Sequence, residues 1–199
     1  MCTKFFSIVF LILIIIACEE TSNLTDPPLN TTSERLNKCS TGINYELIPL
    51  PEKSNLWEDS IFTVSQEIDG SVGGRIILDK YYIDEDGDSV LMKADLRIPA
   101  GSFKGNKTIT LIVDKNYAQV HFYPSMVFDD TLKLFQSFEG LHLENYQTGV
   151  LDFVFIKDDG SIELVKKNGV QVIVPTGIVR VMNAKLIHFS RYGWIRKSN

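Results

Sequence analysis

The chain has 199 residues, of which 44% are hydrophobic and 11% aromatic, and its 20 Lys and Arg against 25 Asp and Glu give a formal net charge of −5. This length suits one ordinary globular domain or two small ones. The acidic balance and the lack of a block of basic residues argue against a nucleic-acid-binding protein, which needs a basic surface for the phosphate backbone. The ordinary apolar content excludes a wholly disordered chain.

The first element along the chain is a short apolar run over residues 5–16, which follows Lys4 and ends at Ala17 and Cys18. A basic residue, an apolar run and a small residue in this order are typical of a secretory signal peptide. The run is too short to span a bilayer core as a helix, which takes about 20 residues. We therefore predict a signal peptide over residues 1–17 rather than a permanent transmembrane segment.

Residues 15–18, with the sequence Ile-Ile-Ala-Cys, resemble the bacterial lipobox. The resemblance implies a diacylglyceryl group on the Cys18 thiol and cleavage in front of Cys18, so that acyl chains such as palmitate anchor the protein in the membrane; several chains on one residue anchor stably. The residue after Cys18 is Glu19 rather than Asp, which by resemblance to enteric sorting rules argues against retention in the inner membrane. The pair Glu19-Glu20 resembles acidic tethers that lead to the cell surface. A periplasm-facing and a surface-exposed location both stay open. The alternative is a conventional cleavage site that happens to precede a cysteine.

Processing at Cys18 would leave Cys39 as the one free thiol, because Cys2 leaves with the signal peptide. An intramolecular disulfide is then impossible. The polar residues around Cys39 offer no base to activate a catalytic thiol.

Residues 18–42 are rich in Thr, Ser, Asn, Pro and Glu, a composition typical of a flexible linker. From residue 43 to residue 199, short β-prone runs alternate with turn residues, and this pattern predicts an all-β domain, an antiparallel β-sandwich. The expected strands cover residues 60–68, 74–83, 89–98, 108–113, 118–122, 132–138, 150–156, 161–166, 170–174 and 179–189. Asp159-Gly160 and Asn168-Gly169 favour tight hairpins, so the strands between residues 150 and 174 are predicted to form a three-stranded meander.

Three segments within residues 60–140 resemble one known domain family. They are Leu-Arg-Ile-Pro-Ala-Gly-Ser-Phe at 96–103, Thr-Ile-Thr-Leu at 108–111 and Phe-Tyr-Pro-Ser-Met-Val-Phe at 122–128, and together they are similar to the zona-occludens/netrin-receptor-type (ZU-like) β-sandwich. The resemblance implies a β-sandwich that serves as a scaffolding or interaction module without catalytic residues. Within it, Phe122 and Phe128 are expected to flank Pro124 at a sheet edge.

The acidic run at residues 84–88 is a candidate metal site, since Asp84, Asp86 and Asp88 stand at alternate positions and carboxylates are ligands for calcium. A helical calcium loop needs Gly at its sixth position, where this chain has Ser89, and the flanking residues are typical of strands. A polar hairpin turn between two strands is therefore the favoured interpretation, with calcium binding as the alternative and no other cofactor expected.

Catalytic motifs do not emerge from the sequence. The three histidines are far apart, and the spacings typical of zinc sites, serine hydrolases and phosphate-binding loops are missing. We therefore expect a protein that is not an enzyme; a hydrolase with paired carboxylates is the last alternative.

Aromatic residues form the remaining candidate site. Tyr117, His121 and Tyr123 share one face of a predicted strand, and Tyr192 and Trp194 lie near the C-terminus. Together they are predicted to form a platform that stacks on a sugar or anchors a protein partner. The alternative is ordinary core and edge packing, because a sandwich needs large side chains.

These features predict a lipid-anchored β-sandwich protein of the bacterial cell envelope, acting as a noncatalytic binding or structural module. A carbohydrate- or peptidoglycan-binding module is the alternative. The expected partners are the membrane, through the N-terminal lipid, and an envelope protein or glycan, but no nucleic acid.

Overall fold

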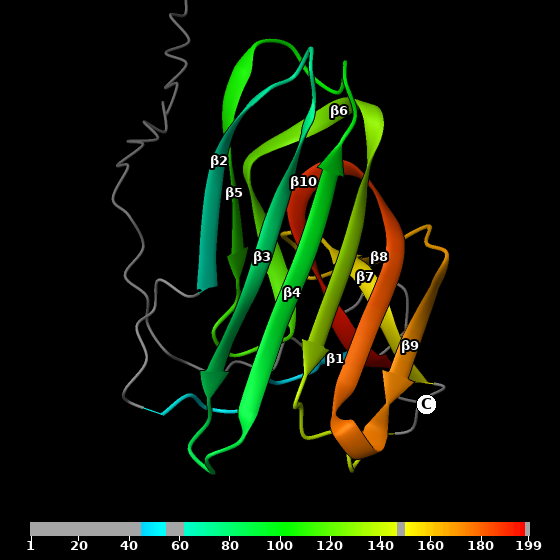
Figure 1. Ribbon diagram of the computed structural model, residues 1–199. Coiled ribbons are helices and arrows are strands. Elements are labelled where there is room, and N and C mark those ends of the chain that lie inside the picture. The colour runs from blue at the N-terminus through cyan, green and yellow to red at the C-terminus, as the bar shows by residue number, and fades with distance from the viewer. Residues whose placement is uncertain (1–44, 55–61, 147–149, 198–199) are drawn as a thin grey trace, which may run out of the picture. The chain divides into compact units, whose positions relative to one another are not determined.

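Ten antiparallel β-strands build the part of the chain that the computed structural model describes, which comprises residues 45–54, 62–146 and 150–197 (Figure 1). In chain order they are β1 (Tyr45–Leu47), β2 (Thr63–Asp69), β3 (Gly74–Ile83), β4 (Ser89–Ile98), β5 (Asn106–Val113), β6 (Gln119–Glu139), β7 (Leu151–Ile156), β8 (Ile162–Leu164), β9 (Gly169–Ile173) and β10 (Ile178–Lys197). A short 3-10 helix, η3 (Val174–Thr176), separates β9 from β10. No helix in this described part is long and apolar enough to cross a membrane. The predicted all-β, antiparallel sandwich class is confirmed.

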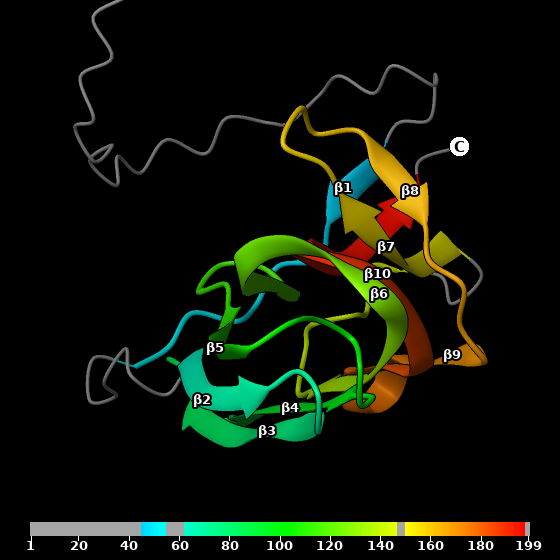
Figure 2. The ribbon, with the colours of Figure 1, turned by 90° about the horizontal axis from the view of Figure 1, so that it is seen from above.

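Two long strands, β6 with 21 residues and β10 with 20, take part in both layers of the sandwich. Figure 2 shows both of them curving from one layer into the other. The first part of β6 and the last part of β10 lie between β5 and β7, whereas the last part of β6 and the first part of β10 lie between β4 and β9. The outer strands of the two layers are completed by β2 and β8 in the first and by β3 in the second.

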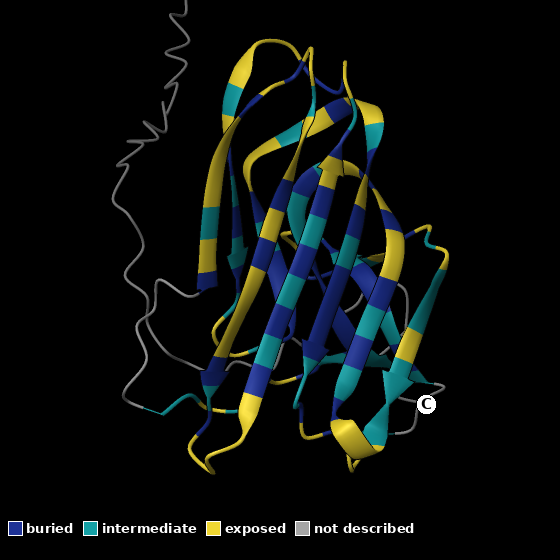
Figure 3. Cartoon of the chain, in the orientation of Figure 1, coloured by how far each residue is buried: buried dark blue, intermediate teal, exposed yellow. Residues whose placement is uncertain are grey.

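The core forms because apolar residues alternate with polar ones along the strands, so that one face of each strand is buried. The pattern is plainest in β4, where the five inward side chains are all buried: Val90, Met92, Ala94, Leu96 and Ile98. Figure 3 shows the same alternation as bands along β3 and β4. These side chains join most of the other buried apolar residues in one large cluster, and a second, smaller cluster consists of Tyr45, Val154, Ile156 and Ile195.

Local turn chemistry predicted the β7–β8 hairpin correctly but not the strand that follows. Val154 pairs with Leu164 across this hairpin, and Gly160 in the turn has a positive φ of 80°. The predicted meander is wrong, because β9 pairs with β10 rather than with β8. The backbone N–H of Asn168 donates to Met182 O on β10, so this end of β9 is fixed by a strand that comes later in the chain.

The strands expected at residues 118–122 and 132–138 are the two ends of the single strand β6. Pairing with β10 continues on both sides of Pro124, which joins the two predicted segments into one strand. Phe122 and Phe128 are also corrected: they lie in the core rather than at a sheet edge. Their rings pack against Phe189 of β10, with centroids 5.0 Å and 4.6 Å away.

Candidate functional site

The predicted aromatic platform is divided between the core and the surface. Tyr192 and Trp194 are only 2% and 0% exposed, so neither ring is available to a ligand at the surface, and this part of the prediction is corrected. The physical reason is that the last part of β10 lies in the middle of its layer, between β6 and β7, where its side chains pack against Phe153 of β7. Burial also raises the pKa of the Tyr192 hydroxyl, which donates a hydrogen bond to His188 O at 2.8 Å.

The other three residues of the predicted platform remain at or near the surface. Tyr123 is 49% exposed, whereas Tyr117 and His121 are half-buried. Tyr117 forms an isolated bridge with Pro49, and its backbone N–H donates to Asp114 Oδ1 at 3.0 Å. His121 and Tyr123 lie two residues apart on β6 and therefore share a strand face, as predicted.

His121 and Tyr123 line a surface hollow of about 330 Å³ between β6, β10 and the turn after β7. The complete lining is His121, Phe122, Tyr123, Ser125, Asp158, Ser190 and Arg191. A second hollow of about 350 Å³ shares Ser125, Asp158 and Ser190 with the first and continues over Val127, Phe155 and His188. We call the two together the β6–β10 hollow.

The hollow arises from a mismatch in the pairing of β6 with β10. Arg191 pairs with His121 and Phe189 pairs with Met126, so residues 122–125 of β6 stand opposite the single residue Ser190 of β10. Extra residues in one strand of a pair bend that strand away from its partner. Pro124 fits this position because it has no N–H to donate to a ladder.

Charged groups line the hollow beside the aromatic ring of Tyr123. The guanidinium of Arg191 donates from Nη2 to Lys157 O at 2.9 Å, while its buried Nε has no hydrogen-bond partner among the described residues. Asp158 is exposed in the β7–β8 turn. The Ser125 hydroxyl donates to Phe189 O at 3.3 Å, so its proton is directed to the backbone. The arrangement offers a ring face, a cation and a carboxylate to one bound molecule.

His121 has a carboxylate neighbour outside the hollow, since its Nε2 lies 3.8 Å from Asp114 Oδ2. Burial acts to raise the pKa of Asp114. This effect is outweighed by the interaction with His121 and by hydrogen bonds that the carboxylate accepts from Asn116 N, Gln119 Nε2 and Tyr117 N. The pKa of Asp114 therefore lies below its usual value. Asp114 is therefore a carboxylate whose oxygens are both partnered.

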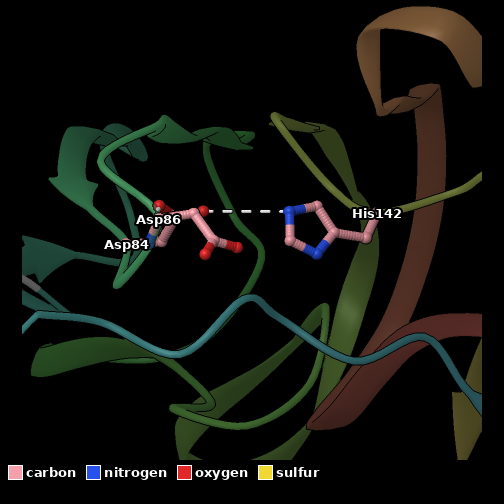
Figure 4. A group of neighbouring side chains, drawn as sticks. All are labelled: Asp84, Asp86 and His142. Carbon is pink, nitrogen blue, oxygen red and sulfur yellow. Dashed lines mark hydrogen bonds and ion pairs between the residues drawn. The ribbon is translucent and has the colours of Figure 1, made fainter.

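A second cluster of side chains lies where the turn between β3 and β4 meets the segment that follows β6. There the ligand atoms of Asp84, Asp86 and His142 lie within 4.8 Å of one another (Figure 4). Asp84 is 2% exposed, whereas Asp86 and His142 are exposed. The predicted calcium set is only partly brought together, because Asp88 is not in this group; its backbone N–H instead donates to Asp84 Oδ1 at 2.8 Å.

His142 is the residue of this cluster that the sequence did not predict as a metal ligand. Its sequence neighbours Leu141 and Leu143 are buried, and the alternation turns His142 out of the core. Its Nε2 lies 3.8 Å from Asp84 Oδ2. The alternation of residues 141–143 predicts that His142 is exposed. No local pattern predicts that the acidic turn at residues 84–88, far away in the sequence, lies beside it.

No protein-family model matches the chain, and searches of the curated proteins and of the solved structures found no significant match. The resemblance to the ZU-like domain therefore stays a prediction. Cys18, the predicted lipidation site, and Cys39 lie outside the described residues.

Proposed function

We propose that this chain is a lipid-anchored protein of the bacterial cell envelope whose β-sandwich acts as a noncatalytic binding module. The anchor rests on the signal-like residues 1–17 and on Cys18, and an interaction module is also what the ZU-like resemblance implies. The β6–β10 hollow is the observation that carries the binding function. It is the place where an exposed aromatic ring, a cation and a carboxylate face one space.

The lining groups favour binding over chemistry. Arg191 and Ser125 both donate to backbone oxygens, Lys157 O and Phe189 O, so these two side chains are held in place by the fold. A nucleophilic serine instead needs a base that accepts its proton. Polar side chains that the fold keeps in fixed positions around an aromatic ring are typical of sites that bind small molecules or protein partners.

A carbohydrate or peptidoglycan ligand is the second candidate, and the exposed ring of Tyr123 favours it. One face of a sugar ring is apolar and can pack on an aromatic ring, while its hydroxyls need donors and acceptors nearby. Arg191, Asp158 and Ser190 supply such groups in the same hollow.

The binding proposal is tested with the full chain in detergent and a panel of immobilised glycans and peptidoglycan fragments, in parallel with cross-linking of envelope proteins in cells. Tyr123→Ala should reduce capture by at least about fivefold, because stacked aromatic contacts commonly carry 1 kcal/mol or more. Tyr81→Ala is the matched control, since Tyr81 on β3 is 53% exposed and does not line the hollow. Equal capture by wild type and Tyr123→Ala would remove the hollow as the binding surface.

The anchor proposal is tested by metabolic labelling with a fatty-acid analogue. Wild type should carry the label and sediment with membranes, and Cys18→Ala should lose both properties. Protease treatment of intact cells, with a periplasmic marker to show that the envelope stays closed, then distinguishes a surface-exposed domain from a periplasm-facing one. An unlabelled wild-type protein would rule out the lipid anchor.

A further inference from the structure

We propose that Asp84, Asp86 and His142 form a binding site for a divalent transition-metal ion of the zinc class. The ion would connect the β3–β4 turn to the segment that follows β6. This site is separate from the β6–β10 hollow and does not depend on the binding function proposed for it.

The main observation is a buried carboxylate oxygen without a donor. Asp84 is 2% exposed, and its Oδ1 accepts hydrogen bonds from the backbone N–H groups of Asp86 and Asp88 at 3.1 Å and 2.8 Å. Its Oδ2 has no hydrogen-bond partner among the described residues and points toward the imidazole of His142 (Figure 4). Buried polar atoms are nearly always partnered, and an unpartnered charged oxygen is costly. A cation between Asp84 and His142 would remove this cost.

The sheet brings the three side chains together. Strand β4 pairs with β3 on one side and with β6 on the other, Ile83 opposite Ser89 and Glu139 opposite Leu91. The β3–β4 turn and the end of β6 therefore leave the sheet at the same end. Gly140 permits a close approach there, because a Cβ at this residue would lie 2.3 Å from Ser89 O.

The position of His142 is fixed by its neighbours. The backbone N–H of Leu141 donates to Gly177 O at 3.0 Å, and the side chains of Leu141 and Leu143 are buried on either side of the histidine. Asp84 is also held by its surroundings, since it forms an isolated bridge with Lys53, and next to it Glu52 O accepts from Glu85 N at 3.0 Å. Two ligands on rigid supports need little rearrangement to bind an ion.

Distances and charge are consistent with a small dication. Ligand bonds to zinc of about 2.0–2.2 Å place two tetrahedral ligands about 3.4 Å apart, close to the 3.8 Å between His142 Nε2 and Asp84 Oδ2. Exposed carboxylates of Glu85 and Asp88 lie in the same turn and add negative charge. This charge attracts cations without supplying further ligands.

The ligand types select the class of metal. Calcium and magnesium prefer oxygen ligands alone, whereas an imidazole nitrogen with carboxylates suits zinc and its neighbours in the first transition row. Three protein ligands leave at least one coordination position for water. Because Asp86 and His142 are exposed, that position faces solvent.

The test is calorimetric titration of the untagged full chain, stripped with a chelator, with ZnCl₂ and separately with CaCl₂. We expect one zinc ion per chain and binding of calcium at least about tenfold weaker. His142→Ala should weaken zinc binding by at least about tenfold, since even partners one shell further from a metal change affinity by 10- to 100-fold. His142 is exposed, so we expect this variant to fold.

Two further variants distinguish the loss of a ligand from the loss of negative charge in the turn. Asp84→Asn retains the Oδ1 acceptor for the turn but replaces the anionic Oδ2, and should also lose at least about tenfold in zinc affinity. Asp88→Asn is the matched control, because it removes a charge from the same turn but no ligand, and should stay within about threefold. Zinc binding that is unchanged in His142→Ala would overturn the proposal. If the affinity instead falls in Asp88→Asn, the ion is bound by the carboxylates of the β3–β4 turn, as in a calcium-binding loop.

Discussion

Two histidine–aspartate pairs of this protein have the same separation but different surroundings. His121 Nε2 lies 3.8 Å from Asp114 Oδ2, and His142 Nε2 lies 3.8 Å from Asp84 Oδ2. The Asp114 carboxylate accepts hydrogen bonds at both oxygens, from two backbone N–H groups and from Gln119 Nε2. The more deeply buried Asp84 accepts hydrogen bonds from the described residues at Oδ1 alone.

The difference shows that the environment of the carboxylate, rather than the pair itself, decides what the pair can do. In the Asp114 pair the histidine adds to a carboxylate that is already satisfied, so the pair belongs to the structure of the turn after β5. In the Asp84 pair, Oδ2 accepts no hydrogen bond from the described residues, and a ligand oxygen of a second carboxylate, Asp86, lies within 4.8 Å. That pair is therefore the one suited to a metal ion.

The largest expected effect is a loss of stability when Asp114 is removed. Asp114→Ala leaves three donors without their acceptor and should lower the free energy of unfolding by about 2–3 kcal/mol. Urea unfolding of the metal-free protein measures this. Asp88→Ala, in an exposed position of the other turn, is the control and should change stability by no more than about 0.5 kcal/mol.

Acid should remove the stability that the Asp114 carboxylate contributes. The pKa of Asp114 is lowered in the folded protein, so its carboxylate contributes stability above the unfolded pKa of about 3.9, and this contribution is lost as the pH falls through the folded pKa. Wild type should therefore be more stable than Asp114→Asn at pH 7, and the difference should shrink toward pH 2. A difference that stays constant over this range would show that Asp114 does not ionise with a lowered pKa.

The opposite sign is expected for Asp84 when metal is removed. Asp84→Asn keeps the Oδ1 acceptor and replaces a buried carboxylate oxygen that accepts no hydrogen bond from the described residues by a neutral amide group, so stability should be unchanged or up to about 1 kcal/mol higher. Urea unfolding in the presence of a chelator measures it. A loss of more than about 1 kcal/mol would mean that Oδ2 has a protein partner in solution, and the contrast with Asp114 would fail.

Small effects are also expected for the two histidines in the metal-free protein. His142 is 54% exposed at its side chain and His121 27%. His142→Ala should change the free energy of unfolding by no more than about 0.5 kcal/mol, and His121→Ala should cost about 1 kcal/mol because a partly buried ring is lost. With zinc present, the order should reverse, since His142→Ala then also loses the stabilisation that a bound ion gives. Thermal unfolding with and without zinc shows which order holds.

The sequence carried most of the local information about the strands. The bounds of β3 and β4 agree with the prediction, and Asp159-Gly160 indicated the β7–β8 hairpin, because alternation and turn residues act over a few neighbours. It indicated Asp84 and Asp86 as candidate metal ligands for the same reason, since both belong to one turn.

The remaining features depend on contacts between distant segments. Strand β6 is continuous because it pairs with β10 on both sides of Pro124, and β9 pairs with β10 instead of with β8. Tyr192 and Trp194 do not belong to the candidate site because they are buried between β6 and β7. The residues of one strand do not determine by themselves which strand pairs with it.

By itself, then, the sequence determined the all-β class, most strand positions and the polar turn at residues 84–88. The tertiary structure alone decided which aromatic residues face solvent, where the β6–β10 hollow forms, and that His142 meets Asp84. The physical reason is that alternation and turn propensity are properties of neighbouring residues, whereas burial and the convergence of side chains arise only when the sheet places segments far apart in the chain against one another.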